Sequence, residues 1–213
     1  MNVFFWYHQR RMLNAMVQNQ WVEAESHTRS LLDKQGPSMG LEYNLAVVLL
    51  GQERFEEASR TLFLAIERYG ESLRLCRLLA DIQYVRGNRN EAIQWYQKTL
   101  DDNPQGKELH LVTARLDLLL DETRFHRIQE TLQGIGEARE QLEKNPQRAF
   151  VLYQAIAEAD PTHVEALNNL GTLYLNSFNN PLAAVEAFSQ VLALVDNPGA
   201  ARNLAKAKKE AKV

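Results

Sequence analysis

Side chains able to support catalysis or metal binding are few and scattered along this sequence. No histidine has a second histidine three or four positions away, the spacing that places two imidazoles on one helix face for a metal. Cys76 is the single cysteine, which excludes an internal disulfide and a cysteine-rich zinc site. Gly134-Ile135-Gly136 lacks the remaining glycine and the preceding strand of a dinucleotide-binding loop. We therefore expect no enzyme activity, no cofactor and no metal ion.

The net charge and the apolar segments of the sequence indicate which kinds of partner the protein is not expected to bind. The chain has a net charge of −3 and a pI near 6.0, whereas a dedicated nucleic-acid binder normally carries a basic excess. The opening apolar run FFWY is interrupted at once by His8, Arg10 and Arg11, so it is too short for a membrane span and lacks the order of a secretory signal. We expect a cytoplasmic protein that neither binds nucleic acid nor inserts into a membrane.

A small residue recurs every 34 residues, at Ala24, Ala58 and Ala92. A second series with the same step consists of Ala46, Ala80 and Ala114. A period of this length indicates stacked helical hairpins, in which small side chains let neighbouring helices approach closely. The clearest helices are expected at residues 5–17, 40–52, 55–69, 72–86, 90–102, 163–176 and 182–195, with one more from Trp21 onwards and a terminal helix over 197–213.

The repeated segments YNLAVVLL, EEASRTLFLA, NEAIQWYQKTLDDNP and NNLGTLYL carry the small, aromatic and proline positions of a known pattern. They resemble the tetratricopeptide repeat (TPR) family. The resemblance implies an all-α fold, a right-handed superhelical solenoid of about six helical hairpins with a C-terminal capping helix. The whole chain, 1–213, is then a single solenoid, with three regular repeats over 1–105, a degenerate region over 106–145, further repeats over 146–196 and the capping helix over 197–213.

The repeating frame fails between Leu120 and Asn145. His126 stands where the next alanine is expected, and Glu130 stands where the next aromatic residue is expected. Helical spacing continues through Gly134 and Gly136, so the segment is either one long helix with two low-propensity positions or two short helices. We favour a break at the glycines, because alternating hairpin arms require a second and a first helix here.

Co-chaperones of the TPR family hold an acidic peptide in a carboxylate clamp, and the sequence matches that clamp only in part. Asn44 matches the asparagine of the second repeat, and Arg74 stands at the lysine position of the third. Gln9, Leu13 and Leu78 replace the other clamp residues. The resemblance therefore argues against a chaperone-tail clamp.

The family resemblance also implies which residues line the concave groove. The N-terminal half of this groove is apolar and aromatic, and the middle of the groove carries arginines. This combination suits a peptide or amphipathic helix with acidic residues. We therefore interpret the protein as a non-catalytic interaction adaptor or assembly scaffold. The alternatives are a self-assembling homo-oligomer and an accessory subunit of an enzyme complex. The candidate groove residues are Trp6, Leu13, Tyr43, Asn44, Val47, Leu50, Arg74, Arg77, Asp81, Tyr84, Leu111 and Arg115.

Overall fold

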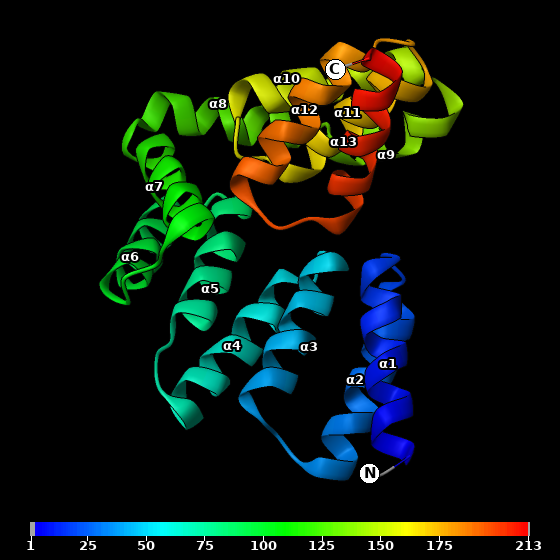
Figure 1. The fold of residues 1–213 in the computed structure, drawn as a ribbon. Coiled ribbons are helices and arrows are strands. Elements are labelled where there is room, and N and C mark those ends of the chain that lie inside the picture. The colour runs from blue at the N-terminus through cyan, green and yellow to red at the C-terminus, as the bar shows by residue number, and fades with distance from the viewer. Residues whose placement is uncertain (1–2, 213) are drawn as a thin grey trace. The chain divides into compact units, whose positions relative to one another are not determined.

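The computed structural model describes residues 3–212, which form thirteen α-helices and no strand (Figure 1). Short turns join consecutive helices into six hairpins, and a thirteenth helix follows. This confirms the expected all-α, TPR-like array of hairpins, and the helix boundaries agree with the expected ones within about two residues. The helices are α1 (Val3–Val17), α2 (Trp21–Gln35), α3 (Met39–Gly51), α4 (Phe55–Tyr69), α5 (Leu73–Val85), α6 (Arg89–Asp101), α7 (Gly106–Leu120), α8 (Glu122–Leu132), α9 (Ile135–Lys144), α10 (Pro146–Ala159), α11 (Val164–Asn176), α12 (Pro181–Leu194) and α13 (Pro198–Ala211).

The chain divides into two compact units, Met1–Asp102 and Asn103–Val213, which we call unit 1 and unit 2. Unit 1 holds α1 to α6, and unit 2 holds α7 to α13. Each unit has its own buried apolar core. The single solenoid expected over 1–213 stays a prediction.

Small residues at the repeating positions let neighbouring helices of unit 1 pack closely. Ala24, Ala58 and Ala92 are fully buried, so their Cβ atoms mark where neighbouring helices come close. Gly51 is a stricter case, because a Cβ added there would lie 2.4 Å from the ring of Trp21. The indole of α2 therefore packs directly on the backbone of α3.

The 34-residue repeat extends to the backbone of the turns inside the three hairpins of unit 1. Asn19, Glu53 and Gly87 all adopt positive φ angles, of 56°, 59° and 80°. In each hairpin the next amide donates a hydrogen bond to a carbonyl five residues back, which closes the first helix. Each turn therefore needs a residue that tolerates the left-handed region, and glycine meets this need at lowest cost.

In unit 2 the helix break expected at the glycines is confirmed. The α8 helix ends at Leu132 and α9 begins at Ile135, after Gly134. The α9 helix then packs against α10 as a new hairpin, and α8 contacts α7 as the second arm of the hairpin before it. The degenerate segment therefore preserves the alternation of hairpin arms. The terminal helix is also present, as α13.

A histidine pair joins α1 to α2. The Nδ1 atoms of His8 and His27 lie 2.9 Å apart, so one ring donates a proton and the other accepts it. Glu23 is the carboxylate that faces the pair, 3.6 Å from Nε2 of His27, and it also binds the guanidinium of Arg11. Tyr7 packs edge-on against both imidazoles. Burial, followed by the charge of His27, lowers the pKa of His8.

We expect the first hairpin to lose stability as the pH falls below about 6.5. The folded-state pKa of His8 lies below its unfolded value, so the unfolded chain takes up the proton first, and the free energy of unfolding decreases with decreasing pH. The measurement is the urea midpoint between pH 7.5 and 5.5, followed by the fluorescence of the tryptophans, all three of which lie in unit 1. His8→Gln should flatten this dependence. Equal slopes in the variant and the wild type would contradict the assignment.

Candidate functional site

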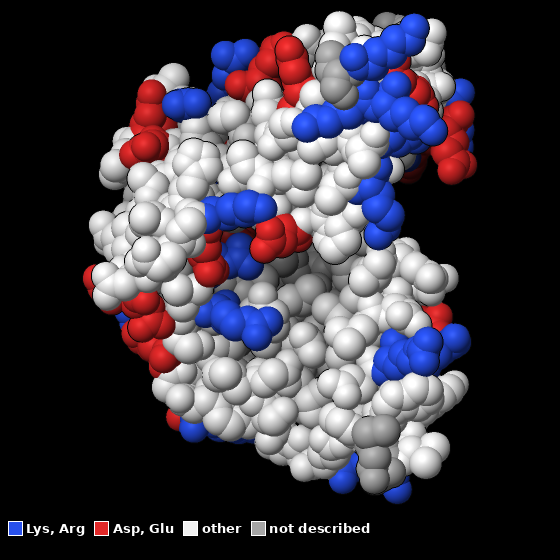
Figure 2. Space-filling view, in the orientation of Figure 1, with Lys and Arg blue, Asp and Glu red and all other residues white. Residues whose placement is uncertain are grey.

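An apolar strip on α3 with arginines on α5 forms the candidate surface of unit 1, which we call the α3/α5 surface. Tyr43, Val47 and Leu50 follow one another at helical spacing and are half-buried against the unit core. Glu42 is the single charged residue of α3, and it is buried in an ion pair with Arg68. Figure 2 accordingly shows a face over α3 free of charged side chains, with basic atoms over α5.

Arg74 is the cation most available to a partner on this surface. Its guanidinium lies 4.4 Å from the centroid of the Tyr43 ring, within the range of a cation–π interaction. The side chain is exposed, and no carboxylate of residues 3–212 pairs with it. The tyrosine ring holds the guanidinium beside the apolar strip while its N–H groups remain open to a carboxylate.

Arg77 and Asp81 are paired with each other, and Tyr84 is buried. The guanidinium of Arg77 forms an ion pair of 3.1 Å with Asp81, whose carboxylate also accepts a 2.7 Å hydrogen bond from the Tyr96 hydroxyl. Tyr84 is 1% exposed and packs on Tyr96 in the core. Tyr84 is therefore a core residue that no partner can contact here, and the charge of Arg77 is already balanced within the unit.

The α1 helix presents a second apolar surface in unit 1. Trp6 and Leu13 are 45% and 48% exposed and lie seven residues apart, so they share one helix face. The guanidinium of Arg10 stands 5.3 Å from the Trp6 ring. Asn44 connects this helix to α3, since its amide lies 4.0 Å from the sulfur of Met12. Trp6 and Leu13 thus lie on accessible surface and Asn44 lies beside it; their role in partner binding stays a prediction.

The two candidate residues in unit 2 have other surroundings. Leu111 is 2% exposed and packs in a core cluster with Leu167 and Phe188. The reason is that α7 packs on α12, a contact that the 34-residue frame does not indicate. Arg115 donates a 3.2 Å hydrogen bond to the hydroxyl of Thr162. Leu111 is therefore a core residue, and Arg115 belongs to a polar network of unit 2.

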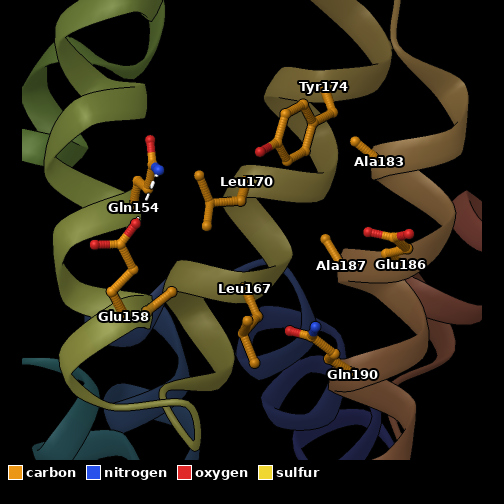
Figure 3. A pocket seen from close by; sticks show the side chains of 10 residues that line it. Gln154, Glu158, Leu167, Leu170, Tyr174, Ala183, Glu186, Ala187 and Gln190 are labelled. Atoms are coloured by element: carbon orange, nitrogen blue, oxygen red, sulfur yellow. Dashed lines mark hydrogen bonds between the residues drawn. The ribbon is translucent and has the colours of Figure 1, made fainter.

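The sequence interpretation missed a hollow in unit 2, formed by α10, α11 and α12 (Figure 3). Its volume is about 230 Å³. Glu158 stands on the α10 side and Glu186 on the α12 side, with α11 between them. The signal that could have revealed it is a run of residues, 149–201, without any lysine or arginine.

Two features bear on chemistry in the described part of the chain, the grouping of possible metal ligands and the cysteine. Among residues 3–212, no three histidine, cysteine or acidic side chains are placed to hold a metal ion. Cys76 is buried, and burial, followed by the nearby Glu71 charge, raises the pKa of its thiol, which disfavours the nucleophilic thiolate. None of the helices in this range is both long and apolar enough to cross a membrane.

Two family models match the sequence, both of them described as tetratricopeptide repeat. One covers residues 43–107 and the other residues 152–186. The first begins in unit 1 and ends five residues into unit 2, the second lies within unit 2, and neither reaches the segment between Leu120 and Asn145. No curated protein sequence matches the chain significantly.

The chain is similar to solved structures at low sequence identity. The TPR2AB domain of yeast Sti1, in a pHSP90 complex, superimposes with a TM-score of 0.51 at 15% identity, over 100% of this chain and 86% of that one. MamA from Desulfovibrio magneticus RS-1 gives a TM-score of 0.49 at 14% identity, over 91% of this chain and 96% of that one. At this identity the first match supports the fold, and neither transfers a function.

Proposed function

The chain belongs to the tetratricopeptide repeat family, whose members are generally protein–protein interaction modules without catalytic activity, and from this premise we propose that it is an adaptor or scaffold. Its α3/α5 surface binds a peptide or amphipathic helix that carries acidic residues. The observation that carries the proposal is Arg74 held on the ring of Tyr43 beside the uncharged strip of α3.

Recognition on this surface combines two kinds of contact. Val47 and Leu50 provide an apolar floor for one or two aliphatic side chains of the partner, since both are only half-buried by their own unit. Arg74 provides a planar donor fork that pairs with a carboxylate in two hydrogen bonds. A partner with an acidic residue about one helical turn from its aliphatic anchor satisfies both contacts. Arg77 contributes less, because it is paired with Asp81.

We expect Arg74→Glu to weaken binding of a leucine- and glutamate-containing helical peptide by about tenfold or more, because the change replaces an attraction with a repulsion. The measurement is fluorescence anisotropy with the labelled peptide, with the same peptide carrying lysine for glutamate as its counterpart. Arg60→Glu is the matched control: Arg60 is exposed on α4, outside the α3/α5 surface, and the net charge changes equally.

The controls decide between the proposed function and its alternatives. Equal weakening by Arg60→Glu would show a nonspecific charge effect and overturn the assignment of the surface. Light scattering at two protein concentrations accompanies the binding measurement, because an adaptor of this kind stays monomeric. A concentration-dependent mass that Leu13→Glu abolishes would instead favour self-assembly through the exposed face of α1.

A further inference from the structure

The hollow of unit 2 has an apolar floor between two polar walls (Figure 3). Leu167, Leu170 and Tyr174 of α11 form the floor. Gln154 and Glu158 of α10 stand on one side, where the glutamine amide donates a 2.9 Å hydrogen bond to the glutamate. Ala183, Glu186, Ala187 and Gln190 of α12 line the other side. Because Ala183 and Gln190 are seven residues apart, this wall runs for roughly 10 Å along α12.

The charged side chains that this region contributes are all negative. Residues 149–201 contain five acidic residues and neither lysine nor arginine. Glu165 and Asp196 are neutralised by ion pairs with Arg139 and Lys107, and Asp160 is buried where it accepts hydrogen bonds from Thr162.

Glu158 and Glu186 are the remaining two, and both are exposed. Within residues 3–212 no cation pairs with either of them. The exposed negative charge of the region that has no cationic partner therefore stands on the two walls of the hollow.

An apolar floor between two exposed carboxylates is complementary to the stem and the charged head of a basic side chain. We therefore infer that the hollow between α10, α11 and α12 docks a cationic segment of a partner protein. A lysine or arginine side chain lies along the floor, with its methylene stem on Leu170 and Tyr174 and its charged head between Glu158 and Glu186. The amides of Gln154 and Gln190 accept further hydrogen bonds from the cation or the partner backbone.

The shape of the hollow restricts the partner further. Its floor leucines are almost fully covered, so it offers little apolar surface to a large side chain. The three alanines along it, Ala157, Ala183 and Ala187, leave room for a chain that lies close to the helices. The partner segment therefore combines basic residues with small or short aliphatic ones. This inference does not rest on the α3/α5 surface and prefers a partner of the opposite charge.

The test uses a labelled helical peptide of lysine, alanine and leucine, and its counterpart with glutamate for every lysine, in fluorescence anisotropy with the full chain. We expect the cationic peptide to bind at least about tenfold more tightly, and its affinity to fall between about 50 mM and 500 mM NaCl, because exposed ion pairs are screened by salt. Glu158→Lys/Glu186→Lys should lower its affinity by about tenfold or more. Far-UV circular dichroism checks that the variant folds, and Glu158→Gln/Glu186→Gln serves as the milder change.

Glu140→Lys/Glu143→Lys is the matched control, since both glutamates are exposed on α9, outside the hollow, and the change in net charge is the same. Equal weakening by this control, or no preference for the cationic peptide, would overturn the proposal. Salt-sensitive self-association of the chain that Glu158→Lys/Glu186→Lys removes would also overturn it. That result would assign the hollow to the lysine-bearing face of α13 in a second copy.

Discussion

Replacing Phe188 by alanine should lower the free energy of unfolding by about 3–5 kcal/mol, the usual cost of removing a buried aromatic ring. Phe188 is fully buried at the centre of the unit 2 core, together with Leu111, Leu167 and Val191. Gly171 lies so close to the ring that a Cβ added to the glycine would stand 2.7 Å from it. The backbone of α11 is thus fitted to the ring and cannot close the cavity without shifting.

Urea unfolding followed by far-UV circular dichroism measures this loss. Leu182→Ala is the matched control on the same helix: Leu182 is 59% exposed, so its truncation should change stability by about 0.5 kcal/mol or less. Gly171→Ala should cost about 1–3 kcal/mol through the clash with the ring. The double variant Gly171→Ala/Phe188→Leu should lose less free energy of unfolding than the sum of the losses in its two single variants. The reason is that the smaller leucine side chain makes room for the added methyl. Simple additivity would show that the glycine and the ring are not coupled.

Replacing Tyr96 by alanine should produce the second large effect, about 3–5 kcal/mol, in unit 1. Tyr96 is fully buried, packs against the ring of Tyr84 and donates a hydrogen bond to Asp81. The alanine variant loses the buried ring and also leaves the Asp81 carboxylate without this donor. The measurement is urea unfolding followed by tryptophan fluorescence, which reports on unit 1.

Two variants separate the ring from the hydroxyl. Tyr96→Phe keeps the packing and removes the hydrogen bond, so it should cost about 1.5–3 kcal/mol, the range for a bond to a charged acceptor. Tyr69→Ala is the control for an aromatic residue of the same unit, since Tyr69 is 40% exposed at the end of α4 and should contribute little. A loss as small for Tyr96→Ala as for Tyr69→Ala would contradict the position of Tyr96 at the core between α5 and α6.

The 34-residue series of alanines was sufficient to predict the hairpins. Ala24, Ala58 and Ala92 are fully buried, and the helices around them begin within about two residues of the expected positions. The break before Ile135 could also be predicted, from two glycines and the alternation of hairpin arms. These features depend on a helix and its nearest neighbours in sequence, so one repeat length of sequence contains the information that specifies them.

The accessible surface could be predicted only in part. The sequence places Arg74, Arg77, Asp81 and Tyr84 on one helix, but it does not show that Asp81 pairs with Arg77 or that Tyr84 lies in the core. Those outcomes depend on how α6 packs on α5. Of these four residues, Arg74 is the exposed one in the tertiary structure, and its guanidinium lies on the ring of Tyr43.

By itself the sequence determined the helices, their pairing into hairpins and the small residues that let them approach, because these follow from patterns within about 34 residues. Only the tertiary structure decided which side chains remain accessible. Leu111 is buried because α7 packs on α12, far along the chain, and the hollow of Glu158 and Glu186 exists because α10 and α12 flank α11. The exposure of a side chain depends on every helix that packs around it. Contacts between helices that are far apart in the chain produce no periodic pattern in the sequence.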